Sequence, residues 1–342
     1  CFHLVLSCKN TNLKNKKAII LLFAANTISG VSQGISLIAI PWFIINQLGM
    51  PGFYGLLFLV VTILSLFWGP YAGTLIDRYD RKKVMLGIQS VGLVCVLGIA
   101  SLGWYLQNTT LWMAAAIMVI TKLIYNIHYP NLYAFAQEIA EKKQYGRISS
   151  ALEVQGQTTL MLSGAMAAFL MEGELFNFTF PAWQMHEIFM LDAGTYILGF
   201  FLLSSIQYDS LVERTINHDD NFVQRLKNGF TYLQERPLIL LFGATSGFVF
   251  ASILVCSFFT LPIFIEQYLH GSQSVYGFTE AAFAFGSLLS GFLILAIFPK
   301  HKLTLGIIIL GFLAGLMYLF IGVNKNFTLL YLAYGVIGFA NA

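Results

Sequence analysis

Long apolar runs recur along the whole sequence and are separated by polar connections. Each run is long enough to cross a hydrocarbon core of roughly 30 Å, so the pattern predicts ten membrane-spanning helices. The predicted spans lie near residues 18–48, 53–76, 84–106, 111–136, 149–171, 187–206, 238–265, 276–298, 303–323 and 327–342. The fold class predicted from this pattern is an all-α polytopic membrane protein.

One connection is much longer than the others and divides six spans from the rest. It contains the stretch "DDNFVQRLKNGFTYLQERP", whose pattern predicts an amphipathic helix. Four of its apolar residues share one helical face: Phe222, Leu226, Phe230 and Leu233. We expect this helix either to lie along the cytoplasmic membrane surface or to act as a plain connection.

The spans and the long connection together predict four parts. They are an N-terminal cytoplasmic tail (1–17), a six-helix bundle (18–206), a cytoplasmic linker (207–237) and a second bundle (238–342). The second bundle is expected to be truncated after the tenth helix, because the last apolar run continues to the final residue.

Composition excludes a soluble globular protein. The chain is 57% hydrophobic and only 10% charged, whereas soluble domains average roughly 25% charged residues. The mean hydropathy is +0.73. The net charge of +3 gives no reason to expect a nucleic-acid partner, because the basic residues follow the predicted topology.

The basic residues alternate with the spans. Every Lys and Arg except Lys122 and Lys325 falls in the N-terminal tail or in the second, fourth, sixth or eighth connection. Basic residues accumulate on the cytoplasmic side of membrane proteins. The distribution therefore predicts a cytoplasmic N-terminus and agrees with the span count.

The second connection carries a dense cluster of charge in the stretch "GTLIDRYDRKK", residues 73–83. It resembles the loop between helices 2 and 3 of the major facilitator superfamily, whose pattern is G-x-L-x-D-R-x-G-R-[RK]. The matching residues are Gly73, Leu75, Asp77, Arg78, Arg81 and Lys82. Asp80 stands at the second glycine of that pattern, a form similar to the drug- and macrolide-efflux branch.

Further stretches are similar to that branch: 129–153, 191–203, 223–242 and 276–293. The resemblance implies a major facilitator fold of two helical bundles with six helices each. Six helices plus at least four are found in this sequence, so we expect the last two helices to be missing from it.

The resemblance places the charged loop at the cytoplasmic mouth between the two bundles. Asp77 ends the second predicted span, where a carboxylate is unfavourable against its own helix dipole and so favours a cation or another helix N-terminus. With Gly73, Arg78, Arg81 and Lys82 it would form a gating latch, for which the superfamily supplies the start of helix 11. The alternative is that these charges only orient the protein in the membrane.

Two polar stripes are candidates for the substrate cavity. Lys122 lies near the middle of the fourth span, and the helical spacing places Asn126, Tyr129 and Tyr133 on its face. The first span carries a second stripe, made of Asn26, Ser29, Gln33 and Ser36. The alternative for both stripes is hydrogen bonding between helices without substrate contact.

Three acidic residues are candidates for proton coupling: Asp192, Glu153 and Glu280. A proton-coupled exporter needs a carboxylate that loses and regains a proton as access alternates. Asp192 is the first choice, with Lys122 as its charge partner across the cavity, and the alternative is that it anchors its helix near the interface. Glu138 and Glu141 are expected to be solvated loop charges.

The function predicted from these features is secondary-active export of drugs or other amphipathic small molecules by proton antiport. The alternatives are an exporter or flippase of a siderophore, lysolipid or metabolite, and a membrane receptor that does not transport. No catalytic constellation, metal site or cofactor motif occurs in the sequence, so an enzyme is not expected. The expected setting is a monomer in a bacterial inner membrane, with substrate, protons and lipid as partners.

Overall fold

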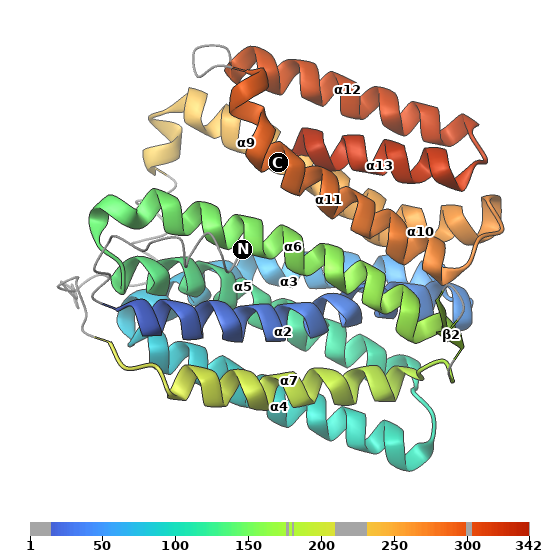
Figure 1. Cartoon of the computed structure of the whole chain (residues 1–342), viewed down its shortest axis with the longest axis horizontal. Coiled ribbons are helices and arrows are strands. Elements are labelled where there is room, and N and C mark those ends of the chain that lie inside the picture. Colours follow the sequence, from blue (N-terminus) through green and yellow to red (C-terminus); the bar gives the residue numbers. More distant parts are fainter. Residues whose placement is uncertain (1–14, 176–177, 180, 209–230, 299–302, 342) are drawn as a thin grey trace.

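The structure is a computed structural model that describes residues 15–175, 178–179, 181–208, 231–298 and 303–341. It is almost entirely helical (Figure 1). A two-residue antiparallel pair, β1 (Glu174–Leu175) and β2 (Phe178–Thr179), lies between two of the helices. Residues 219–230 of the predicted amphipathic linker helix lie outside the described residues.

The first half of the molecule, residues 15–208, contains six long helices. They are α2 (Lys16–Trp42), continued by the π-helix η1 (Phe43–Gln47), α3 (Pro51–Arg78), α4 (Arg81–Leu106), α5 (Leu111–Glu138), α6 (Tyr145–Glu172) and α7 (Met185–Ser204). A short 3₁₀ turn, η2 (Lys142–Gln144), precedes α6.

The second half, residues 231–341, contains four helical spans. The first is composite, with α9 (Pro237–Val255), η3 (Cys256–Thr260), α10 (Leu261–Ile263) and η4 (Phe264–Tyr268) in continuous succession. It is followed by α11 (Gln273–Ile297), α12 (Leu303–Val323) and α13 (Phe327–Asn341).

Each of the ten predicted spans coincides with one of these helical segments. Among the described residues, eight helices are long and apolar enough to cross a membrane. Of the other two, α13 is apolar but has 15 residues, and α6 is long but carries many polar residues. The prediction of an all-α polytopic membrane protein is confirmed.

Small residues allow the helices of the first half to pack closely. A Cβ added at Gly34 of α2 would lie 2.3 Å from the Ser163 hydroxyl of α6, and one at Gly92 of α4 would lie 2.4 Å from the Tyr196 ring of α7. These approaches bring α2, α4, α6 and α7 together with little space between backbones. Small residues at helix contacts are typical of membrane proteins, where packing rather than the hydrophobic effect joins helices.

The molecule has two ends, which we name by their charge. The basic end holds the start of α2, the charged loop between α3 and α4, and the start of α9. The opposite end holds η1, η4 and the start of α11.

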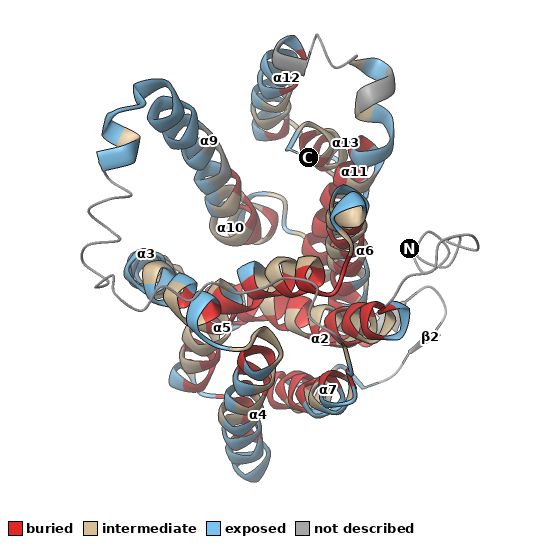
Figure 2. Ribbon diagram, turned by 90° about the vertical axis from the view of Figure 1, so that its left-hand side faces the viewer, coloured by how far each residue is buried: buried red, intermediate tan, exposed pale blue. Residues whose placement is uncertain are grey.

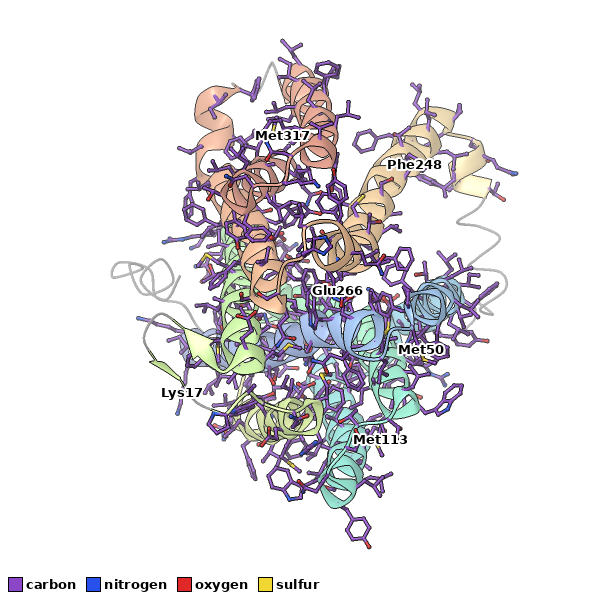
Figure 3. All side chains as sticks on the ribbon, turned by 90° about the vertical axis from the view of Figure 1, so that its right-hand side faces the viewer. Lys17, Met50, Met113, Phe248, Glu266 and Met317 are labelled. Atoms are coloured by element: carbon purple, nitrogen blue, oxygen red, sulfur yellow. The ribbon has the colours of Figure 1, made fainter. Side chains whose placement is uncertain are left out.

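The two halves meet at the opposite end (Figure 3). A Cβ added at Gly164 of α6 would lie 2.6 Å from the Gly277 carbonyl of α11. Trp42 stacks on Tyr276 with ring centroids 6.1 Å apart. Tyr54 stacks on Phe259 at 6.3 Å. The contact is therefore tight and mainly apolar.

The halves diverge at the basic end. Every residue from 237 to 245 in α9 is exposed, whereas Leu261 and Ile265, near the other end of the same span, are buried. Viewed from the basic end, α9 stands away from α3 and α5 (Figure 2). The arrangement is that of two bundles joined at one end and open at the other.

Candidate functional site

The charged loop begins α4 with a helix cap. Asp80 has φ −58 and its carboxylate accepts a hydrogen bond from the backbone N–H of Lys83, at 2.9 Å from Oδ1. An N-terminal cap of this kind satisfies a backbone donor that the helix leaves free. The residue that replaces the second glycine of the superfamily pattern thus has a normal backbone conformation and a structural role.

Arg81 is bound to the end of α5. Its Nη1 lies 3.3 Å from Glu138 Oε2 and also donates to the carbonyl of Ala134. The Asn131 side chain donates to the Arg81 carbonyl at 2.9 Å. Glu138 is only 2% exposed, so its prediction as a solvated charge is wrong, because burial requires the carboxylate to be paired.

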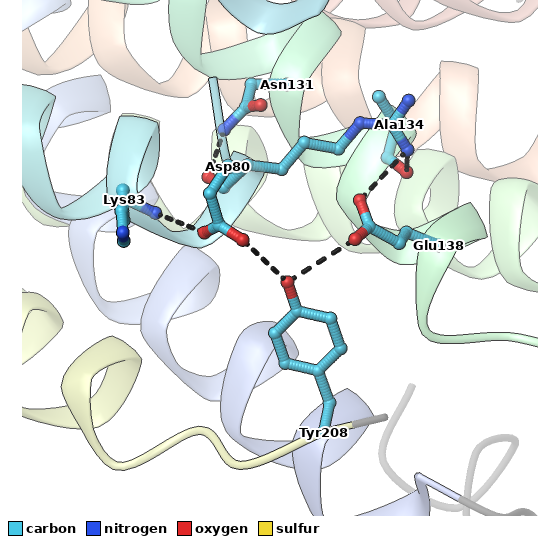
Figure 4. A network of polar contacts seen from close by, with 7 residues as sticks. Asp80, Lys83, Asn131, Ala134, Glu138 and Tyr208 are labelled. Carbon is cyan, nitrogen blue, oxygen red and sulfur yellow. Dashed lines mark hydrogen bonds and ion pairs between the residues drawn. The ribbon is translucent and has the colours of Figure 1, made fainter. Parts of the chain in front are cut away.

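Tyr208, which follows α7, joins the same network (Figure 4). Its hydroxyl lies 3.3 Å from Asp80 Oδ2 and 3.4 Å from Glu138 Oε1. The Lys82 ammonium donates to the carbonyls of Ser204 and Ile206, at 2.9 and 2.6 Å. Arg81 and Lys82 therefore bind α5 and the end of α7 within the first half.

The remaining predicted latch residues are exposed at the basic end. Among the residues that the structure describes, Asp77 has no hydrogen-bond or ion-pair partner, and a Cβ at Gly73 would meet nothing within 4 Å. The Arg78 guanidinium lies 5.9 Å from the ring centroid of Tyr79. A latch to the second half stays a prediction, and the halves are apart at this end.

The predicted stripe on α2 contacts other helices of the first half. Asn26 donates to Gln155 Oε1 of α6 at 3.1 Å, Ser29 accepts from Gln89 of α4 at 3.3 Å, and Ser36 donates to Asp192 of α7 at 3.3 Å. All three α2 residues are buried, and Gln33 is partly buried. These bonds support the alternative of interhelical hydrogen bonding.

His128 of α5 is a buried polar residue that sequence reasoning missed. Its Nε2 lies 2.9 Å from Asn26 Oδ1, and Gln155 in turn donates to the carbonyl of Phe23 at 2.6 Å and to Thr27. Three helices, α2, α5 and α6, are thus joined by one polar chain. The available signal was that His128 lies in an apolar run between Asn126 and Asn131.

The Lys122 stripe on α5 is more open. The Lys122 ammonium lies 5.5 Å from the Tyr125 ring centroid, and the Tyr125 and Tyr129 centroids are 4.4 Å apart. Asn126 Nδ2 has no hydrogen-bond partner among the described residues. The stripe thus brings a lysine, an unpartnered amide nitrogen and aromatic rings together on α5.

At the basic end of this stripe Tyr133 donates to Glu153. The Tyr133 hydroxyl lies 2.8 Å from Glu153 Oε2, and Gln157 donates to Glu153 Oε1 at 3.3 Å. Glu153 is exposed. It therefore differs from the other two candidate acids, which are enclosed.

Asp192 is enclosed between α2, α4 and α7. It is 0% exposed. Ser36 donates to its Oδ2, while its Oδ1 has no hydrogen-bond partner among the described residues. Within the same part of the chain no ion pair joins it to Lys122, whose ammonium lies beside Tyr125. A buried carboxylate without a cation is costly in its ionised form.

Glu280 of α11 is the corresponding acid of the second half. It is 1% exposed, and its Oε1 has no partner among the described residues. Ser257 is a hydrogen-bonding neighbour, and Tyr276 and Tyr334 lie within electrostatic range. Asp192 and Glu280 are thus buried acids, one in each half, that have hydroxyl neighbours and no ion pair among the described residues, whereas the buried Glu138 is paired with Arg81.

A groove of about 270 Å³ lies between α2 and α6. It is lined by Ala24, Thr27, Ile28, Gln155, Thr158, Thr159 and Leu162. Across the described residues, no group of three or more His, Cys, Asp and Glu side chains is arranged to hold a metal ion.

Comparison with known proteins settles the family. The sequence profile of the Major Facilitator Superfamily matches residues 22–342. The chain belongs to this superfamily. Its charged loop between α3 and α4 and its halves joined at one end agree with that membership.

The curated relatives are distant in sequence. The chain is 22% identical over 284 residues to "Macrolide efflux protein A" of Streptococcus pyogenes. The aligned region covers 82% of this chain and 66% of that protein. It is 22% identical over 298 residues to "Uncharacterized MFS-type transporter YfiS" of Bacillus subtilis (strain 168), covering 85% and 66%. The chain thus spans somewhat less than two thirds of the length of these relatives.

Solved structures share the fold. A bacterial homologue of the human lysosomal transporter Spinster, in an inward-facing and unoccupied conformation, matches with a TM-score of 0.64 and 13% identity, covering 97% of this chain and 74% of that chain. The D-xylose–proton symporter matches with a TM-score of 0.60 and 12% identity, covering 95% and 80%. At this level of identity the matches show a shared fold.

Proposed function

We propose that this protein exports amphipathic small molecules, with macrolide-type drugs as the first candidates. The observation that carries the proposal is the arrangement of the halves, which are joined at the opposite end and apart at the basic end. Such a shape gives one side of the membrane access to the interior, as alternating access requires. The choice of substrate rests on the name of the relative in Streptococcus pyogenes, "Macrolide efflux protein A".

Proton antiport is the proposed source of energy. Asp192 and Glu280 are buried carboxylates at membrane depth. Ionisable groups are costly to place there, so their presence indicates a function. Either group, when protonated, is neutral and compatible with its enclosed setting. A cycle of protonation and release at these two acids would couple the proton gradient to the movement of the halves.

The proposed setting is the bacterial inner membrane, with the basic end in the cytoplasm and the protein acting as a monomer. The distribution of Lys and Arg supports this orientation. The structure then corresponds to a conformation open to the cytoplasm, in which a substrate enters beside Lys122 and Asn126.

The test uses the full-length protein in a bacterial host without its own macrolide pumps. Accumulation of a labelled macrolide is measured with and without an uncoupler, for the native protein and for Asp192→Asn, Glu280→Gln and Lys122→Ala. Glu141→Gln is the matched control, because Glu141 is a surface residue that pairs with Lys143.

We expect the native protein and the control to lower macrolide accumulation, and the uncoupler to abolish the effect. At least one acid substitution should reduce efflux more than about tenfold with unchanged expression. Efflux that survives both the uncoupler and the two acid substitutions would overturn proton antiport. If none of the macrolides or dyes tested is exported, the proposed substrate class is wrong.

A further inference from the structure

One side-chain hydrogen bond joins the two halves within the part of the chain that the structure describes. Glu172 Oε1 accepts from the backbone N–H of Ser274 at 3.0 Å. Glu172 is the last residue of α6, and Ser274 is the second residue of α11. The bond therefore connects the end of a first-half helix to the start of a second-half helix.

The charge of Glu172 decides the strength of this bond. A carboxylate at the C-terminal end of its own helix is unfavourable, whereas next to the N-terminus of another helix it is favourable. A hydrogen bond to an ionised acceptor is roughly twice as strong as one between neutral groups. Glu172 is thus more stable with the halves together than apart, provided that it is ionised.

The other contacts between the halves at this end do not depend on charge in the same way. They are backbone approaches between α6 and α11 and stacked aromatic rings, such as Trp42 with Tyr276. Tyr331 of α13 lies within electrostatic range of Glu172. On the α11 side, the exposed His270 precedes the helix, and Tyr276 and Glu280, both buried, follow within it. Lys325, at the same end, lies instead over the Tyr268 ring at 5.0 Å.

We propose that the Glu172 carboxylate is a latch between the two halves at the opposite end. It holds the end of α6 against the start of α11, and the hold is lost when the halves separate at this end. The proposal rests on the alternating access proposed above. It assigns to the outer side the same arrangement that the sequence predicts for Asp77 at the basic end, a carboxylate ending one helix and facing the start of another.

The experiment measures the opening of the opposite end directly. Spin labels are attached through Met50→Cys in the first half and Val323→Cys in the second half of the full-length protein, with the native cysteines replaced. Both positions are exposed. The distance distribution between the labels is recorded by double electron–electron resonance at neutral pH, in detergent or lipid nanodiscs.

Glu172→Gln removes the charge but keeps the size of the side chain. We expect it to raise the ratio of separated to joined halves about tenfold, because a neutral acceptor makes a weaker bond to the start of α11. Glu172→Asp keeps the charge but shortens the side chain, and it should give a ratio between those of the native protein and Glu172→Gln.

Glu187→Gln is the matched control. Glu187 is also a carboxylate that accepts a backbone N–H at this end, at 2.6 Å from the nitrogen of Gln184, but both residues belong to the first half. The control should leave the distances between the halves unchanged. A Glu172→Gln distribution equal to the native one, or an equal effect of Glu187→Gln, would overturn the latch. Because the measurement needs no substrate, its result is independent of whether macrolides are exported.

Discussion

Arg81 and Glu138 form an ion pair that ties the start of α4 to the end of α5, with 3.3 Å between Nη1 and Oε2. The pair is extended by Tyr208, whose hydroxyl reaches both Glu138 and Asp80. The charged loop is thereby fixed to the first half. When the halves move against each other, we expect this loop to move with α4, α5 and the end of α7 as one unit.

Glu138→Gln should destabilise the first half. The variant removes one charge of a largely buried pair, and we expect the free energy of unfolding to fall by roughly 2 kcal/mol. The loss is smaller than for a fully buried pair because the Arg81 side chain is 20% exposed. Thermal unfolding in detergent measures the effect. Glu141→Gln breaks an exposed pair of 2.7 Å and should change stability by less than about 0.5 kcal/mol. Equal effects of the two variants would contradict the assignment.

Two glycines of α11 should respond to alanine in opposite directions. A Cβ at Gly277 would lie 2.6 Å from the Gly164 carbonyl, whereas one at Gly291 would meet nothing within 4 Å. Gly277→Ala should lower the free energy of unfolding by about 1–3 kcal/mol, because the added methyl group would be forced against the Gly164 backbone. Gly291→Ala should stabilise its helix by up to about 1 kcal/mol. The shift in unfolding temperature gives both signs, and stabilisation by both variants would mean that α6 and α11 are not in close contact.

Alanine at Asn26 should reduce stability, whereas alanine at Asn126 should reduce substrate affinity. Asn26→Ala removes the hydrogen-bond partner of His128 Nε2 and of Gln155 Oε1, so a loss of about 1–3 kcal/mol in the free energy of unfolding is expected. Asn126→Ala removes an amide whose nitrogen has no partner among the described residues, and stability should be unchanged while substrate affinity falls. Thermal unfolding and macrolide binding, measured on the same preparations, test both statements.

Asp77→Asn should reduce transport without reducing stability in the conformation seen here. The side chain is exposed at the basic end and pairs with no other described residue, so its removal breaks no bond in this state. If the latch at this end exists, the conformation closed to the cytoplasm loses its hold and turnover falls. Transport at the native rate with full surface expression would leave orientation in the membrane as the role of Asp77.

The helices were predictable because membrane spans are set by length and hydropathy. Ten apolar runs gave ten helical segments, including α6, whose polar residues lower its hydropathy but whose position between two connections was clear. The superfamily was also predictable, since the charged loop carries a specific pattern of Gly, Asp and Arg residues.

The partners of the polar residues could not be predicted. Glu138 lies beside Lys142 and Lys143 in the sequence, which indicated a solvated loop, but α5 extends to Glu138 and brings it to Arg81. His128 and Gln155 are 27 positions apart by number and meet only through Asn26 of a third helix. Hydropathy says which side chains are at membrane depth, whereas the rotation of each helix decides which of them meet.

The π-helical turns η1 and η4 have similar sequences, with Pro, Phe, Ile and Leu at matching positions. The first half reads "PWFIINQLG" at residues 41–49, and the second reads "PIFIEQYLH" at 262–270. Leu48 N donates to Phe43 O and Leu269 N to Phe264 O, at 2.9 and 3.0 Å. Both segments end on a residue of positive φ, Gly49 at 65° and His270 at 54°.

These two segments therefore place the same backbone turn at the contact between the halves, so a substitution in one has a defined counterpart in the other. The second segment has a histidine where the first has glycine, in a conformation that costs a non-glycine residue roughly 1 kcal/mol. His270→Gly would give both turns the same final residue and remove that cost from the second half.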